Sequence, residues 1–155
     1  MNSVNHVPLR KPKTPPHTNR DPLVAAYDEL NALWKQAEEQ LAAMRVSVWV
    51  EVELPVIRGG GAGSSDFHEW DERDSLCWGK PDKEWRLCIS TTRTYNIDNR
   101  EDEWGIRPVA ECSMEDRIKL VQHFPALKAK MVEARQKLIP VVADAIAALK
   151  NALAM

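Results

Sequence analysis

The stretch PALKAKMVEARQKLIPVVADAIAALKNAL, residues 125–153, decides how this chain can fold. Its apolar residues recur at steps of four and three, with one extra four at the end, and this spacing keeps them on one face of a helix. The stripe consists of Leu127, Met131, Ala134, Leu138, Val141, Ala145 and Leu149. A single helix cannot bury such a stripe, so the sequence predicts that another element packs against it.

A second helix of similar length is predicted near the N-terminus. Asp21-Pro22 is typical of a helix start, with an N-cap followed by proline at the first helical position. The same steps of four and three then follow at Leu23, Tyr27, Leu30, Trp34, Ala37, Leu41 and Met44. We expect the two helices to pack side by side, either within one chain or across a dimer.

The period changes from helical to two at Arg45. Residues 46–54 alternate between valine or leucine and polar or aromatic residues, which predicts a half-buried strand limited by Pro55. The next segment, RGGGAGSS at residues 58–65, lacks the lysine of a phosphate-binding loop, so we interpret it as a flexible connector.

An acidic segment, DFHEWDERD, follows at residues 66–74. We predict a solvated loop here. Its acids and His68 also offer ligands for a divalent ion, which supports an alternative hypothesis of a small metal-assisted hydrolase. The segment lacks the second histidine of a zincin motif and the spacing of an EF-hand, so no metal site is predicted.

A β-hairpin is predicted over residues 76–90, with its turn at Pro81-Asp82. This turn pairs Trp78 with Trp85 and Leu76 with Leu87, and it places these side chains and Ile89 in the core. The opposite face then carries Cys77, Arg86, Cys88, Ser90 and Thr92.

The remaining segments complete an α+β order. Residues 94–103 predict a long loop, and residues 106–112, interrupted by Pro108, predict an edge strand. Ser113 and Asp116 open a short helix, and Pro140 predicts a bend in the final one. The predicted fold is a small antiparallel sheet of three to four strands packed on long N-terminal and C-terminal helices.

Composition limits the functional classes. The chain has 155 residues, of which 44% are hydrophobic and 28% charged, and it shows neither a membrane-spanning run nor a signal peptide. We predict a single domain over residues 22–155, reduced cysteines and a cytoplasmic location. Residues 1–21 predict a disordered, basic, proline-rich tail, for which solvation is favoured over contact with nucleic acid.

The predicted site lies on the sheet face away from the helices. Trp49, Glu51, Arg86, Ser90 and Thr92 combine an indole with charges and hydroxyls, which is typical of sites for a nucleotide, peptide or sugar. No catalytic motif or cofactor site is predicted, which favours a non-catalytic binding or regulatory protein. A third hypothesis is a helical scaffold that forms homo-oligomers through its alanine-rich C-terminal end.

Overall fold

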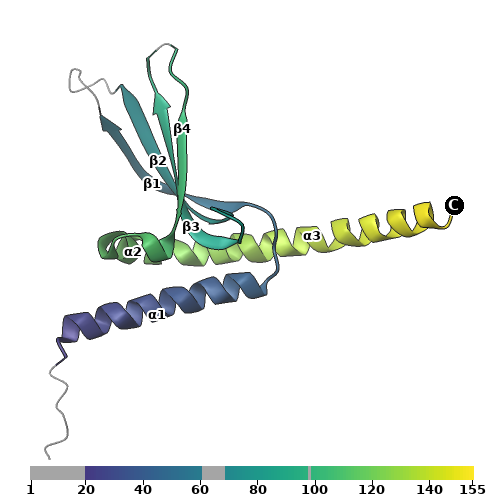
Figure 1. The fold of residues 1–155 in the computed structure, drawn as a ribbon, viewed down its shortest axis with the longest axis horizontal. Coiled ribbons are helices and arrows are strands. Elements are labelled where there is room, and N and C mark those ends of the chain that lie inside the picture. The colour runs from purple at the N-terminus through teal and green to yellow at the C-terminus, as the bar shows by residue number, and fades with distance from the viewer. Residues whose placement is uncertain (1–19, 61–68, 98) are drawn as a thin grey trace, which may run out of the picture.

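The computed structural model describes residues 20–60, 69–97 and 99–155, without the side chains of Val56 and Ile57. Residues 1–19 of the predicted tail and residues 61–65 of the predicted connector lie outside these residues, whereas residues 58–60 form the end of a strand instead of a connector. Figure 1 shows the strands rising from a base of helices, with their upper ends extending beyond it. The described elements are α1 (Pro22–Ala43), β1 (Val50–Gly60), β2 (Trp70–Gly79), β3 (Arg86–Tyr95), β4 (Glu103–Pro108), α2 (Met114–Leu120), α3 (Phe124–Leu153) and two 3-10 turns at Val109–Glu111 and Val121–His123.

The α+β class and the antiparallel sheet are confirmed. Among the described residues, four strands form one sheet in the order β1-β2-β3-β4, so each strand pairs with its neighbours in sequence. Both predicted helix caps are present as well. The Asp21 side chain accepts a hydrogen bond from the Leu23 N–H at 2.8 Å, and the Ser113 hydroxyl accepts one from the Asp116 N–H at 3.2 Å.

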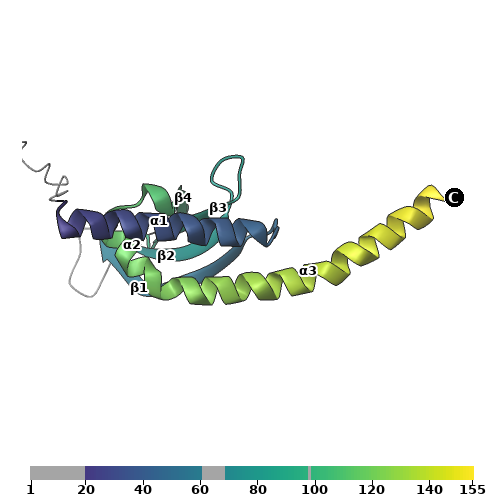
Figure 2. The same cartoon turned by 90° about the horizontal axis from the view of Figure 1, so that it is seen from below.

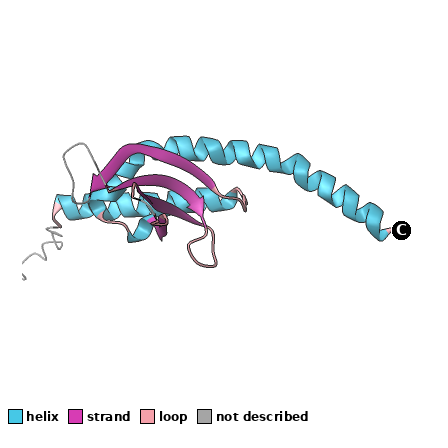
Figure 3. Cartoon of the chain, turned by 90° about the horizontal axis from the view of Figure 1, so that it is seen from above, coloured by secondary structure: helices cyan, strands magenta, loops and turns pink. Residues whose placement is uncertain are grey.

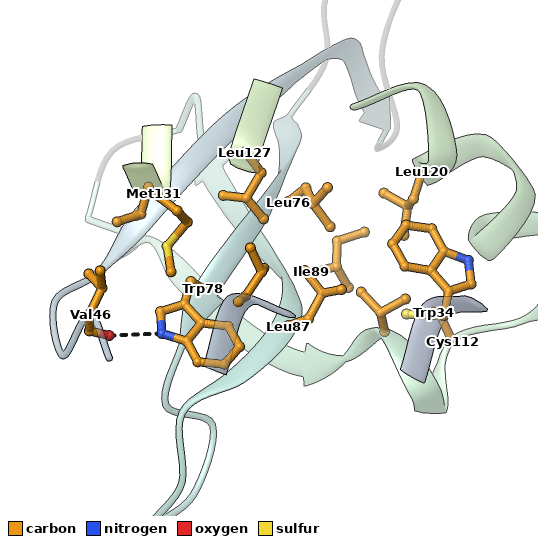
Figure 4. Packing of buried hydrophobic residues seen from close by; sticks show 13 residues of the cluster. Trp34, Val46, Leu76, Trp78, Leu87, Ile89, Cys112, Leu120, Leu127 and Met131 are labelled. Carbon is orange, nitrogen blue, oxygen red and sulfur yellow. Dashed lines mark hydrogen bonds between the residues drawn. The ribbon is translucent and has the colours of Figure 1, made fainter. Parts of the chain in front are cut away.

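The core lies between the lower half of the sheet and the helices (Figure 4). Side chains from β2 and β3 meet Leu127 and Met131 of α3, which are both fully buried. The Trp78 Nε1–H donates to the Val46 carbonyl at 3.0 Å, which satisfies the indole within this apolar layer. On the face toward the helices, β2 and β3 bury Leu76, Trp78, Leu87 and Ile89, as predicted.

Helix α1 packs mainly on the sheet and also contacts the start of α3, where the Trp34 ring meets Phe124 and Lys128 donates to the Gln40 side chain at 3.2 Å. It contacts β3 and the turn Val109–Glu111, and it buries Trp34 and Leu41, whereas Leu23 at its start is 55% exposed. The Trp34 Nε1–H donates to the Arg117 carbonyl at 3.2 Å. The expected side-by-side packing of the two long helices is therefore only partly realised, because the apolar stripe of each helix also packs on the sheet.

Strand β1 differs from the prediction at both ends. It begins at Val50 rather than Val46, because Arg45 has a φ of 58° and the Val46 carbonyl is held by Trp78. It also continues through Pro55, where its register with β2 shifts between Glu53 and Ile57. A proline is tolerated there because β1 is an edge strand.

Two further strand predictions are corrected. Residues 70–74 belong to β2 rather than to an acidic loop, since Glu72 and Asp74 are paired with arginines of neighbouring strands. Strand β4 is Glu103–Pro108 instead of residues 106–112, although its predicted edge position is confirmed. The last residues of the predicted strand form the 3-10 turn that buries Val109 and lead to buried Cys112.

The predicted hairpin has the right faces and the wrong register. Trp78 lies opposite Leu87 and Leu76 opposite Ile89, a shift of two residues from the expected pairs. The connection spans residues 80–85, so Trp85 lies in the loop. Because side chains alternate with a period of two, a shift of two residues leaves every side chain on its predicted face.

Helix α3 changes environment along its length. Leu127 and Met131 are buried and Ala134 and Leu138 are partly buried, whereas the residues beyond Pro140 are exposed. Figures 2 and 3 show this second half curving away from the sheet and ending far from it, which agrees with the predicted bend. Along the described chain, we find no helix whose length and apolar character suffice to span a bilayer.

Candidate functional site

The outer face of the sheet, opposite the helices, contains an open hollow of about 810 Å³. Alternation along three adjacent strands places its side chains there, since Glu53, Ser75 and Ser90 are opposite one another in register. The hollow is lined by Trp49, Glu51, Glu53, Asp71, Arg73, Ser75, Ser90, Thr92, Thr94, Asn96 and Trp104.

The structure brings together four of the five predicted site residues. Trp49, Glu51, Ser90 and Thr92 all line the hollow. Arg86 does not, because its guanidinium extends to α1, where its Nε lies 3.2 Å from Glu38 Oε2. The Glu38 carboxylate also accepts a hydrogen bond from the Leu87 N–H at 3.0 Å, so this pair ties β3 to α1. Ligand binding by Arg86 at the hollow has no support in this geometry.

Two tryptophans form one end of the hollow. The rings of Trp49 and Trp104 have centroids 6.0 Å apart and are tilted by 55°. Trp49 lies against Gly79, where an added Cβ would be 2.5 Å from its Cζ3 atom. Glycine at this position therefore allows the indole to lie on the sheet. Trp49 is 39% exposed and Trp104 59% exposed, so both rings are accessible to a ligand.

Carboxylates dominate the charge of the hollow. Glu53 is paired with Arg73 at 3.3 Å, and Asp71 accepts a hydrogen bond from the Asn96 amide at 3.2 Å. Within the described part of the chain, the Glu51 carboxylate has no ion-pair partner, although its backbone carbonyl accepts a hydrogen bond from Lys130. Three acids against one arginine give the hollow a net negative charge.

Besides Glu53, which the alternation of residues 46–54 places on the same face as Glu51, sequence reasoning missed six lining residues, and one pattern would have revealed half of them. Interpreting residues 70–74 as a loop hid the alternation that puts Asp71, Arg73 and Ser75 on the same face as Cys77. Trp104 was assigned to the end of a loop, but it lies opposite Thr92 in the sheet. The two others are Thr94 and Asn96.

The two cysteines predicted for this face are buried and do not line the hollow. Cys77 and Cys88 lie opposite each other and are fully buried. Desolvation raises the pKa of each thiol to about 12. Thiolates are therefore scarce at neutral pH, which argues against either residue as a nucleophile.

A separate charge cluster occupies the upper half of the inner face. Arg58 contacts Asp74 at 2.6 Å, Arg93 contacts Glu72 at 2.6 Å, and the Thr91 hydroxyl donates to Asp74 at 2.7 Å. The hydrogen bond from Arg93 lowers the pKa of the Glu72 carboxyl. These charges satisfy one another, so we assign the cluster to holding the strands together.

The metal hypothesis depends on His68, which lies outside the described residues and stays a prediction. Within residues 20–60, 69–97 and 99–155, no three His, Cys, Asp or Glu side chains gather closely enough to hold a metal ion.

Comparison with known proteins adds no family to this geometry. The chain matches no protein family, no curated protein and no solved structure. Functional inference therefore depends on the site itself.

Proposed function

We propose that this chain is a non-catalytic binding protein whose outer sheet hollow holds an organic cation, such as the ammonium or guanidinium group of a peptide side chain or polyamine. One observation carries the proposal: the exposed Trp49–Trp104 pair lines the same hollow as the unpaired carboxylate of Glu51. Indole faces attract cations, and a carboxylate adds a charge-assisted hydrogen bond.

The charge of the hollow separates this ligand class from the alternatives. A nucleotide phosphate is disfavoured because the only cation lining the hollow within the described residues, Arg73, is already paired with Glu53. An uncharged sugar would use the tryptophans and the hydroxyls of Ser75, Ser90 and Thr92 and would leave the excess acid without a role.

Tryptophan fluorescence tests the proposal with three probes: spermidine, an acetylated and amidated Gly-Arg-Gly peptide, and maltose. We expect saturable quenching by at least one cationic probe, and at least about tenfold weaker binding after Trp104→Ala or Glu51→Gln. Glu29→Gln removes an exposed carboxylate on α1 and serves as the matched control. Binding of maltose alone, or equal loss in the control, would overturn the assignment of a cation.

We also propose that the chain forms homo-oligomers through α3. The supporting observation is the second half of this helix, where Val141, Ile146 and Leu149 are 61%, 51% and 61% exposed. Exposed apolar patches of this kind mark association surfaces. Light scattering after size-exclusion chromatography should give a multiple of the 17.6 kDa chain mass that falls on dilution. A constant mass of one chain at all concentrations would contradict it.

A further inference from the structure

A second apolar stripe on α3, which shares only Leu149 with the stripe described above, remains uncovered. It begins at Val132 and follows steps of three and four through Arg135 to the end of the helix. Such spacing is the heptad pattern of helices that pair. The apolar members and their exposed fractions are Val132 41%, Ile139 57%, Val142 52%, Ile146 51%, Leu149 61% and Leu153 77%.

The stripe starts inside a groove. Val132 and Arg135 line a cavity of about 390 Å³ between α3 and the end of α1, together with Gln40, Ala43 and Met44. The first half of α3 thus borders a shallow groove, whereas the second half exposes apolar side chains. The stripe is centred near Pro140, since Val132 and Leu149 lie equally far from the midpoint between residues 140 and 141, about 13 Å along the axis at 1.5 Å per residue.

We infer that a second copy of this chain covers the stripe, with the two α3 helices antiparallel and the second half of each lying on the first half of the other. This inference rests on the proposed self-association and specifies its geometry. In antiparallel helix pairs, the two kinds of heptad position face each other. One register brings Val132 opposite Leu149 of the partner subunit and Ile139 opposite Val142 of the partner subunit.

This register repeats each contact by symmetry. The two-fold axis passes between Pro140 and Val141, so every pair occurs twice and the assembly closes as a dimer. Arg135 comes opposite Ile146 of the partner subunit, where its aliphatic stem covers the isoleucine while its charged end stays in water. The one cation in the stripe between Val132 and Leu153 is therefore accommodated.

A second copy fits better than an unrelated helix because one chain supplies both surfaces at matched length. A parallel pair would cover Ile139 to Leu153 but would place two copies of Arg135 opposite each other at its upstream end. The antiparallel register instead covers Val132 and the groove beside it, which gives the longer interface. Alanines 143, 145 and 152 flank the stripe and permit close approach of the helices.

Sedimentation equilibrium of the full chain tests the surface. Ile146→Lys puts a second cation opposite Arg135 of the partner subunit and should raise the dimer dissociation constant by at least about 100-fold. Asn151→Lys puts the same charge on the side of α3 away from the stripe and should change it by less than about threefold. Ile146 is already 51% exposed, so circular dichroism should show both variants folded. Equal effects of the two substitutions would contradict the assignment of this stripe as the dimer interface.

Disulfide trapping tests the register separately. Val132→Cys and Leu149→Cys chains are mixed and oxidised, and intact mass spectrometry identifies the linked pairs. The native Cys77, Cys88 and Cys112 are buried and leave the added thiols as the accessible ones in the described chain. We expect the mixed pair to dominate over either self-pair.

The outcomes of the two experiments distinguish the two proposals. Dimers that trap only self-pairs would replace the antiparallel register with a parallel one, and dimers that trap no pair would also overturn it. Self-association itself would survive in both cases. A chain that remains monomeric at all concentrations would end both proposals.

Discussion

The two faces of the sheet are built from the same strands, but helices cover only the inner one. On the inner face, Leu76 and Ile89 are buried under α1 and α3. On the outer face, one residue away along each strand, Ser75 and Ser90 line an open hollow. Alternation therefore assigns a side chain to a face but does not decide its burial, because Cys77 and Cys88 on the outer face are also fully buried. Four predictions test this contrast, ordered by expected effect on stability.

The largest effect is expected for a pair of substitutions on opposite faces. Leu76→Ala creates a cavity in a fully buried layer and should lower the free energy of unfolding by about 2–5 kcal/mol. Thr92→Ala, on the outer face, should change it by less than about 0.5 kcal/mol. Urea denaturation followed by circular dichroism measures both. Similar losses from the two variants would contradict the assignment of the faces.

Gly79→Ala tests how the outer face holds Trp49. The added Cβ would be 2.5 Å from Trp49 Cζ3 and 3.0 Å from Ile106 Cδ1, so the indole must move. We expect a loss of about 1–2 kcal/mol, together with a red shift of tryptophan fluorescence. The shift should be absent in a Trp49→Phe background, and its persistence there would assign it to another tryptophan.

Acidification should weaken the charge cluster on the upper inner face. The Glu72 pKa is lowered by Arg93, so this carboxylate stabilises the fold above its ordinary pKa of about 4.5, and the contribution is lost as pH falls through the lowered value. Glu72→Gln should remove roughly 1 kcal/mol at pH 7 and make the acid limb of the stability curve less steep. An unchanged limb in this variant would show that other groups control acid unfolding.

The smallest effect concerns the buried thiols of the outer face. Because the pKa of Cys77 and of Cys88 is raised to about 12, both should react with a disulfide reagent at pH 8 only after unfolding. Stability itself should fall only above the ordinary thiol pKa of about 9, where the unfolded chain ionises first. Rapid reaction of the native protein would show that the sheet opens around these two thiols without global unfolding.

Most elements were predictable because their signals are local. Alternation from Leu87 to Thr92 identified both faces of β3, and Asp21 and Ser113 identified two helix starts. Cross-strand register was not predictable, since a turn centred on Pro81 and a longer loop give the same alternation. Charge was also the reason that one strand was predicted as a loop. The acids of residues 70–74 suggest solvent exposure, whereas in the structure Glu72 and Asp74 pair with arginines of neighbouring strands.

The candidate site was predictable only as far as the sheet face. Trp49, Glu51, Ser90 and Thr92 follow from parity alone. Arg86 has the same parity, but it stands at the end of β3, where Glu38 of α1 is within reach. Such a contact joins residues 48 positions apart, and no periodicity within either element signals it.

The position of Trp34 has a consequence for the order in which the chain folds. Every strand pairs with a neighbour in sequence, whereas the Trp34 indole is held by the Arg117 carbonyl, 83 residues later. During synthesis the hairpins can form before this partner has left the ribosome, while α1 keeps its apolar face exposed. We therefore expect the docking of α1 to complete folding, and Trp34→Phe to accelerate unfolding far more than it slows refolding in stopped-flow measurements.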